Sequence, residues 1–149
     1  MIIYAAYART QFVASYGIAV VGHFQSDSGR ADFEMPMPLG ETTEQFADIM
    51  AVLLGLHCVK ARFRTSDVLL RIEGKTQQFL DRDASGQYLK EAVPGAERLR
   101  ALYEKFSSVK IEPVASDDLY FTKAKALALK AASSFKRTPG ISDVCAFPD

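Results

Sequence analysis

Short apolar runs fill the first forty positions, in the pattern of β-strands. The runs occupy residues 2–8, 12–24 and 32–37. The third run alternates like a half-buried strand, with Phe33, Met35 and Met37 on one side, while Pro36 and Pro38 suit a strand end or a sheet edge. Turn-forming residues at 26–29 separate the second run from the third. This pattern predicts an antiparallel meander of three strands.

Between residues 40 and 62 the apolar period lengthens to that of an α-helix. Thr42 or Thr43 can cap its start. A broad apolar arc follows at helical spacing, comprising Phe46, Ile49, Met50, Leu53, Leu54 and His57. The opposite side holds Asp48, Ala51 and Gly55, so it is small enough to approach a sheet closely. A helix that is apolar nearly all round is buried, and the small side of this one carries a single carboxylate, Asp48.

The rest of the chain alternates between strands and helices. Strands are predicted at 67–74 and 109–114, and helices at 75–80, 94–106 and 116–135, with a connector at 81–88. Ser116 or Asp117 suits the start of the last helix. This order predicts an α/β fold with a mixed five-stranded sheet, three antiparallel strands followed by two more, and helices on both faces. We expect one domain over residues 1–135 and an irregular tail over 136–149.

Composition limits the classes of function. Eighteen basic residues balance eighteen acidic ones in 149 residues, so a nucleic-acid role would depend on a local patch. Cys58 and Cys145 lie far apart and form no ligand-spaced pair. A disulfide between them is possible, but reduced thiols in a cytoplasmic protein are favoured. The N-terminus lacks the features of a secretory signal, and the longest apolar stretch is too short to span a bilayer. We therefore expect a cytoplasmic protein with no membrane partner.

Five segments resemble the ribonuclease H family when they are taken in order. "MIIYAAYA" is similar to its first strand, which usually runs apolar-apolar-Tyr-Thr-Asp-Gly-Ala, and "TTEQFADIMAVLLGL" to its first helix. "LLRIEGKTQQFLDRD" is similar to the fourth strand and the helix after it. "SGQYLKEAVPGAERLRALYEKF" resembles a segment of the shorter, archaeal-like subgroup, and "VKIEPVASDDLYFTKAKALALKAA" the closing strand and helix. The resemblance covers residues 1 to about 135 and implies a ribonuclease H-like fold.

The resemblance also implies a set of catalytic positions. In the family four carboxylates hold two divalent metal ions about 4 Å apart for phosphodiester cleavage. The matching positions here are Ala6, Asp48, Glu73 and Lys125. Shifted alignments give Ala5 for the first position and Lys123 for the last. Two of the four ligands are therefore missing. We expect an ammonium group to replace a metal and to neutralise Asp48 and Glu73, with Tyr7 filling space nearby.

The favoured hypothesis is a catalytically inactive domain that acts as a protein-interaction module. The apolar tail residues Ile141, Val144 and Phe147 suit a protein partner, and a homodimer is also compatible with the sequence. This reading predicts no catalytic residues, no metal and no cofactor.

Two alternatives stay open at this point. A basic strip on the last helix and tail could bind nucleic acid without cutting it, through Lys123, Lys125, Lys130, Lys136 and Arg137. A solvated helix face explains the same charges. The other alternative is a nuclease that needs Mg²⁺ or Mn²⁺ at a rebuilt site of Asp48, Glu73 and Asp117. Capping is the more ordinary role for Asp117 and Asp118, and a core or edge position for His57.

Overall fold

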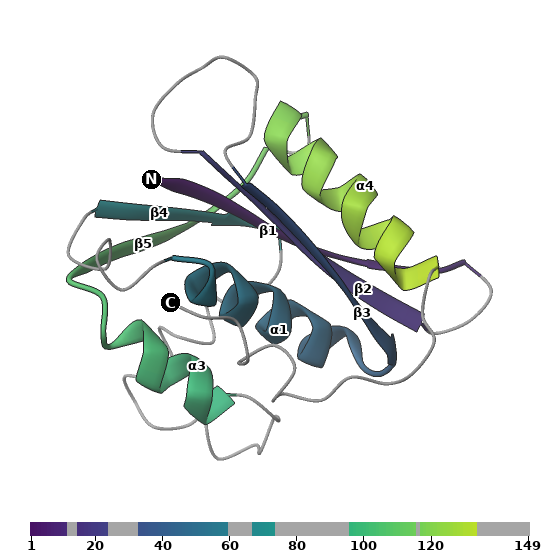
Figure 1. Ribbon diagram of the computed structural model, residues 1–149, viewed down its shortest axis with the longest axis horizontal. Helices are drawn as coiled ribbons and strands as arrows, with labels where there is room; N and C mark the ends of the chain where they lie inside the picture. Colours follow the sequence, from purple (N-terminus) through teal and green to yellow (C-terminus); the bar gives the residue numbers. More distant parts are fainter. Residues whose placement is uncertain (12–14, 24–32, 60–66, 74–95, 116, 134–149) are drawn as a thin grey trace.

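Five strands form one mixed sheet in the computed structural model, which describes residues 1–11, 15–23, 33–59, 67–73, 96–115 and 117–133 (Figure 1). The strands are β1 (Ile2–Arg9), β2 (Ser15–His23), β3 (Phe33–Glu41), β4 (Asp67–Ile72) and β5 (Ser108–Pro113). Their order across the sheet is β3-β2-β1-β4-β5. β1, β2 and β3 pair antiparallel, whereas β4 pairs parallel with both β1 and β5. The predicted α/β fold with a mixed five-stranded sheet is confirmed.

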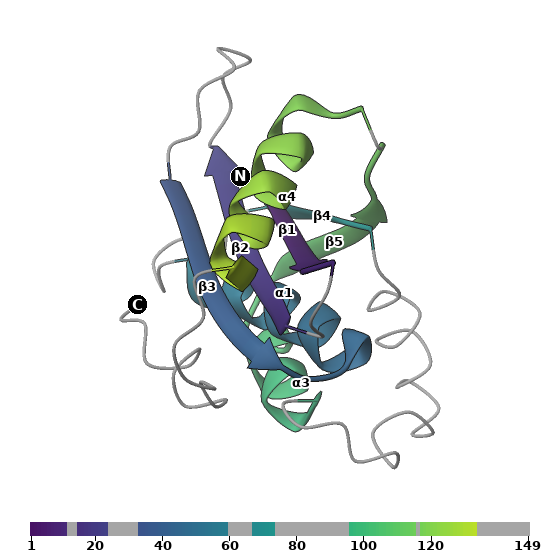
Figure 2. The same ribbon diagram turned by 90° about the vertical axis from the view of Figure 1, so that its right-hand side faces the viewer.

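Helices cover both faces of this sheet (Figures 1 and 2). The described helices are α1 (Glu44–His57), α3 (Ala96–Tyr103) and α4 (Leu119–Ser133). α1 and α3 lie on one face, where Ile3, Ile18 and Leu70 join the larger hydrophobic core. α4 lies on the other face, over a smaller cluster that includes Tyr4 and Val21. Alternate residues of β1 therefore serve two different cores.

The predicted burial of α1 is confirmed. Every residue from Ala47 to Leu56 is buried, so the helix is enclosed by the sheet and by α3. Its small side faces the sheet, because a Cβ added at Gly55 would stand 3.4 Å from Ile3 Cγ2 and 3.5 Å from Leu70 Cδ1. This close approach places Asp48, on the same side of the helix, against the sheet.

β3 is longer than the sequence predicts. It continues through Pro36 and Pro38 to Glu41, so the predicted end at Met37 is wrong. Among the described strands β3 lies at the edge of the sheet, where a proline nitrogen can face away from β2 without removing a ladder hydrogen bond. Phe33, Met35 and Met37 do pack together against the larger core, as their alternation predicts.

Side-chain caps set the starts of two helices. Thr43 Oγ1 accepts a hydrogen bond from Phe46 N at 3.2 Å, which selects one of the two predicted caps of α1. α4 is capped by Asp118, whose Oδ1 accepts from Tyr120 N at 2.9 Å and Phe121 N at 3.1 Å. The predicted start at Ser116 or Asp117 is therefore wrong, whereas the capping role also predicted for Asp118 is confirmed. Asp118 is also held by contacts to the sheet, which the local sequence does not reveal.

Other predictions fall partly or wholly outside the described residues. These are the helix at 75–80, the connector at 81–88, the first residues of the second strand and the tail at 136–149. The domain boundary at residue 135 stays a prediction. Within the described segments, no helix is long and apolar enough to cross a membrane.

Candidate functional site

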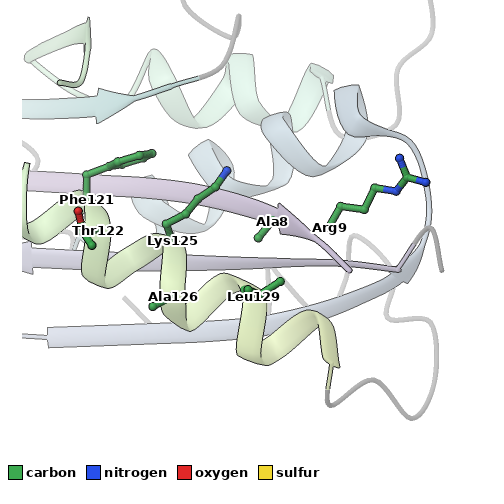
Figure 3. A pocket seen from close by; sticks show the side chains of 7 residues that line it. All are labelled: Ala8, Arg9, Phe121, Thr122, Lys125, Ala126 and Leu129. Carbon is green, nitrogen blue, oxygen red and sulfur yellow. The ribbon is translucent and has the colours of Figure 1, made fainter. Parts of the chain in front are cut away.

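Lys125 of α4 is the central cation of the site. Its Nζ donates a hydrogen bond to the main-chain oxygen of Tyr7 at 2.6 Å and forms an ion pair with the Glu73 carboxylate. The same Nζ lies 5.0 Å from the centroid of the Tyr7 ring. Figure 3 shows the side chain rising from α4 across β1. One ammonium group therefore joins the last helix to β1 and to the residue that follows β4.

Ala6 lies level with this ion pair on the neighbouring strand. Ala5 is the partner of Ile72 in the parallel β1–β4 ladder, so the next positions along the two strands are Ala6 and Glu73. Ala6 is completely buried in the cluster beneath α4. The structure thus brings together three of the four catalytic positions that the resemblance implies. They hold a methyl group, a carboxylate and an ammonium.

Tyr7 separates this ion pair from the carboxylates of α1. Its hydroxyl donates to Glu44 Oε1 at 2.8 Å. Asp48, one turn further along α1, is 8% exposed. Burial raises the pKa of the Tyr7 hydroxyl, as does the hydrogen bond to Glu44, and the negative charges of Asp48, Glu44 and Glu73 raise it further. Burial and the three carboxylates together therefore favour the neutral form of the phenol.

This arrangement predicts a specific loss of stability at high pH. The pKa of Tyr7 is raised in the folded state, so the stability it contributes is complete below about pH 10 and falls as the pH rises above that value. The free energy of unfolding of the wild type should decline more steeply above pH 10 than that of Tyr7→Phe. Urea titrations at pH 8, 10 and 11 measure the two slopes. Equal slopes for the two proteins would contradict a raised pKa of Tyr7 in the folded state.

The three carboxylates of the alternative metal site, Asp48, Glu73 and Asp117, are not gathered in the described structure. Asp117 is exposed at the start of α4. In the part of the chain that the structure describes, no three His, Cys, Asp or Glu side chains gather closely enough to hold a metal ion. Asp48, Glu73 and Asp117 consequently do not form one site.

The basic strip is divided by ion pairs. Lys123 Nζ lies 2.5 Å from Glu34 Oε1 on β3, and Lys125 is bound to Glu73. Lys130 is exposed, while Lys136 and Arg137 lie outside the described residues. Two of the three described lysines are therefore neutralised by carboxylates of the sheet side. Their capacity to attract phosphate groups is reduced accordingly.

A cluster around Arg71 is a feature that the sequence did not reveal. Arg71 Nη1 donates to Tyr4 Oη at 2.7 Å and Nε donates to Glu112 Oε1 at 3.0 Å. Nη1 also lies 3.8 Å from Asp118 Oδ2, and the Tyr4 hydroxyl donates to that same oxygen at 3.3 Å. The hydrogen bond to Glu112 is the largest of the effects that raise the pKa of Arg71. This cluster connects β1, β4 and β5 to the cap of α4.

His23, His57 and Cys58 are buried or half-buried side chains. His23 is 3% exposed and stacks on Tyr120, with ring centroids 4.3 Å apart. Neither of its ring nitrogens has a hydrogen-bond partner among the described residues. His57 is half-buried at the end of α1. Cys58 has a free thiol whose pKa burial raises to about 11, so it is a poor nucleophile at neutral pH.

Comparisons with known proteins identify the fold. No family model matches the chain, and no curated protein matches its sequence. Ribonuclease H1 of the halophilic archaeon Halobacterium salinarum superposes with a TM-score of 0.65 and 21% identity, over 90% of this chain and 98% of that one. The N-terminal ribonuclease H domain of Rv2228c from Mycobacterium tuberculosis gives 0.66 and 18%, over 89% and 93%. This chain has the ribonuclease H fold.

A further solved structure with this fold contains nucleic acid. LC11-RNase H1 in complex with an RNA/DNA hybrid superposes with a TM-score of 0.66 and 19% identity, over 89% of this chain and 96% of that one. The structural match spans nearly the whole of each relative. The match at these identities establishes the fold, and the activity must be argued from the site itself.

Proposed function

We propose that this ribonuclease H-like domain acts by binding a protein partner and does not cleave nucleic acid through two metal ions. The observation that carries the proposal is the Lys125 ammonium group, bound to Glu73 and to the main-chain oxygen of Tyr7. A fixed positive charge on one of the expected metal ligands repels a divalent cation. Ala6, level with Glu73, offers no oxygen to replace the missing ligand.

The chemistry of two-metal cleavage explains why these two replacements matter together. The metal ions activate the attacking water and stabilise the leaving oxygen, and Mg²⁺ requires oxygen ligands in near-octahedral geometry. A methyl group and an ammonium supply neither oxygens nor negative charge. Asp48 and Glu73 alone leave a site with half of the ligands implied by the resemblance, and Glu73 is already engaged by Lys125.

A cleavage assay tests the proposal directly. Purified protein is incubated with a labelled RNA/DNA hybrid and about 10 mM Mg²⁺ or about 1 mM Mn²⁺. It should release no more product than a control without protein. Asp48→Ala is the matched control, because it removes a remaining carboxylate and should change nothing. Metal-dependent cleavage that Asp48→Ala abolishes would overturn the proposal and support a rebuilt nuclease site.

Non-cleaving binding of nucleic acid is the second candidate. It is favoured by the exposed cations Arg9 and Lys130 and by the hybrid-bound state of LC11-RNase H1. It ranks below a protein partner because Lys123 and Lys125 are paired with carboxylates of the same chain. A gel-shift assay at low salt with hybrid, duplex and single-stranded RNA distinguishes the two. A salt-dependent shift that Lys123→Glu with Lys130→Glu removes would favour the second candidate.

The compartment and the assembly state also belong to this proposal. A reduced thiol at Cys58 and the absence of a membrane-spanning helix from the described residues are compatible with the proposed cytoplasmic location. Self-association is the alternative to a different protein as the partner, and sedimentation of the pure chain separates the two.

A further inference from the structure

The outer face of α4 carries an uncharged stripe. Five residues recur along the helix at alternating spacings of three and four, and all are exposed: Leu119, Thr122, Ala126, Leu129 and Ser133. Leu119 is 66% exposed and Leu129 is 47% exposed, and they are the large hydrophobic residues exposed in the described part of the chain. At 100° per residue these five positions fall within about 80° of the helix circumference, so they form one seam.

This seam lies opposite the face that packs on the sheet. The inward face is already complete, being formed by Tyr120, Phe121, Ala124, Ala128, Ala131 and Ala132. The outer side of a surface helix ordinarily bears charged residues. A seam with two exposed leucines at three-four spacing is instead the pattern by which one helix packs along another. The fifteen residues of α4 offer a contact about 22 Å long.

Cations lie along both sides of the seam. Lys123 and Lys130 follow one side, and Lys125 follows the other, where Arg9 projects from the end of β1 (Figure 3). α4 contains no aspartate or glutamate between Leu119 and Ser133. Lys123 and Lys125 are bound to Glu34 and Glu73, whereas no ion pair within the described residues engages Arg9 or Lys130. The seam is thus uncharged along its centre, with two exposed leucines, and positive at its margins.

A hollow adjoins the seam on the Arg9 side. It has a volume of about 540 Å³ and is lined by Ala8, Arg9, Phe121, Thr122, Lys125, Ala126 and Leu129 (Figure 3). Small side chains at Ala8 and Ala126 open it, and the cationic groups of Arg9 and Lys125 stand at its margin. It is large enough to receive a bulky side chain of a neighbouring molecule.

We propose that this seam, with its hollow, is the docking site for an amphipathic helix of a protein partner that bears acidic residues beside its apolar stripe. Leucine-sized side chains of the partner contact Leu119 and Leu129, and one enters the hollow. Its flanking carboxylates pair with Arg9 and Lys130. A second copy of this chain fits poorly, because two α4 helices side by side set lysine against lysine. This inference rests on the proposed function and specifies the chemistry of the partner.

A titration with defined peptides tests the proposal. The probe is a peptide of about three heptads with Leu at both core positions and Glu at the flanking positions, and the comparison peptide has Lys in place of every Glu. Amide chemical shifts of the isotope-labelled full chain should move along 119–133 and at Arg9 with the acidic peptide. The basic peptide should bind at least about tenfold more weakly.

Three variants localise the binding. Leu129→Asp and Arg9→Glu should each weaken binding of the acidic peptide by about tenfold or more, and both positions are exposed enough to leave the fold intact. Lys105→Glu makes the same charge change on the exposed turn after α3, and should leave binding unchanged. Shifts that avoid α4, equal binding of both peptides, or concentration-dependent self-association through the seam would each overturn the proposal. A positive cleavage assay overturns the proposed function without moving these shifts.

Discussion

Gly17→Ala is expected to detach α4 from the sheet and to lower the free energy of unfolding by about 3 kcal/mol or more. α4 crosses β2 at Gly17, where a Cβ would overlap the main-chain atoms of Ala128 and Ala132 and stand 3.0 Å from the carbonyl carbon of Ala131. Main-chain atoms cannot rotate away as a side chain can, so the whole helix has to move. Chemical denaturation followed by circular dichroism measures the loss.

Gly55→Ala is the matched control for this variant. It makes the same chemical change in α1, but its Cβ would meet Ile3, Leu70 and Ala5 side-chain atoms at 3.4, 3.5 and 3.8 Å. Alanine is favoured over glycine inside a helix by about 1 kcal/mol, which offsets the tighter contact with Ile3. We expect a change of no more than about 1 kcal/mol in either direction. Equal losses of unfolding free energy at the two glycines would contradict the explanation that the close approach of α4 to β2 requires glycine at position 17.

Arg71→Ala is expected to lower the free energy of unfolding by about 2 kcal/mol, which is the second largest effect. The substitution removes hydrogen bonds to Tyr4 and Glu112 and leaves Asp118 without its nearest cation. Removing one member of a partly buried polar network leaves its partners incompletely satisfied. The start of α4 should loosen as well, because Asp118 also caps that helix. Faster hydrogen exchange at Tyr120 and Phe121 would report this local effect.

Two further variants show whether geometry or charge accounts for this loss. Arg71→Lys keeps the charge but loses the planar fork, so it should recover only part of the stability. Lys110→Ala removes a cation from the same cluster, where Lys110 Nζ lies 3.9 Å from Glu112 Oε2 and the side chain is 78% exposed. Exposed pairs of this kind contribute little, so Lys110→Ala should stay within about 0.5 kcal/mol of the wild type. A large loss at Lys110 would contradict this explanation.

The sequence predicted the architecture because its apolar periods are strong and local. The alternation in the first forty residues identified the meander, and the apolar residues nearly all round α1 identified the buried helix. Both are present. The end of β3 was missed because prolines were taken to stop a strand. Their tolerance depends on the strand being at the edge of the sheet, which is a property of the whole fold.

The candidate site was predicted less completely, for a related reason. Alignment to the ribonuclease H pattern predicted Lys125 near Glu73, and the structure shows that ion pair. The pairing of Lys123 with Glu34 and the Arg71 cluster join residues separated by 41 to 114 positions, and no local spacing encodes them. A capping role was predicted for Asp118, but the choice of Asp118 over Ser116 or Asp117 depends on its contacts with Tyr4 and Arg71. Long-range polar partners of this kind follow from the register of the sheet.

The Lys125–Glu73 pair also has a consequence for how the domain responds to its surroundings. A bound metal ion is in equilibrium with solution and leaves when its free concentration falls below its dissociation constant. Lys125 is part of the chain, so its charge is present at a fixed local concentration and no chelator can remove it. Under the proposed function, a domain built this way keeps the same electrostatic balance at this end of the sheet whether divalent ions are abundant or scarce.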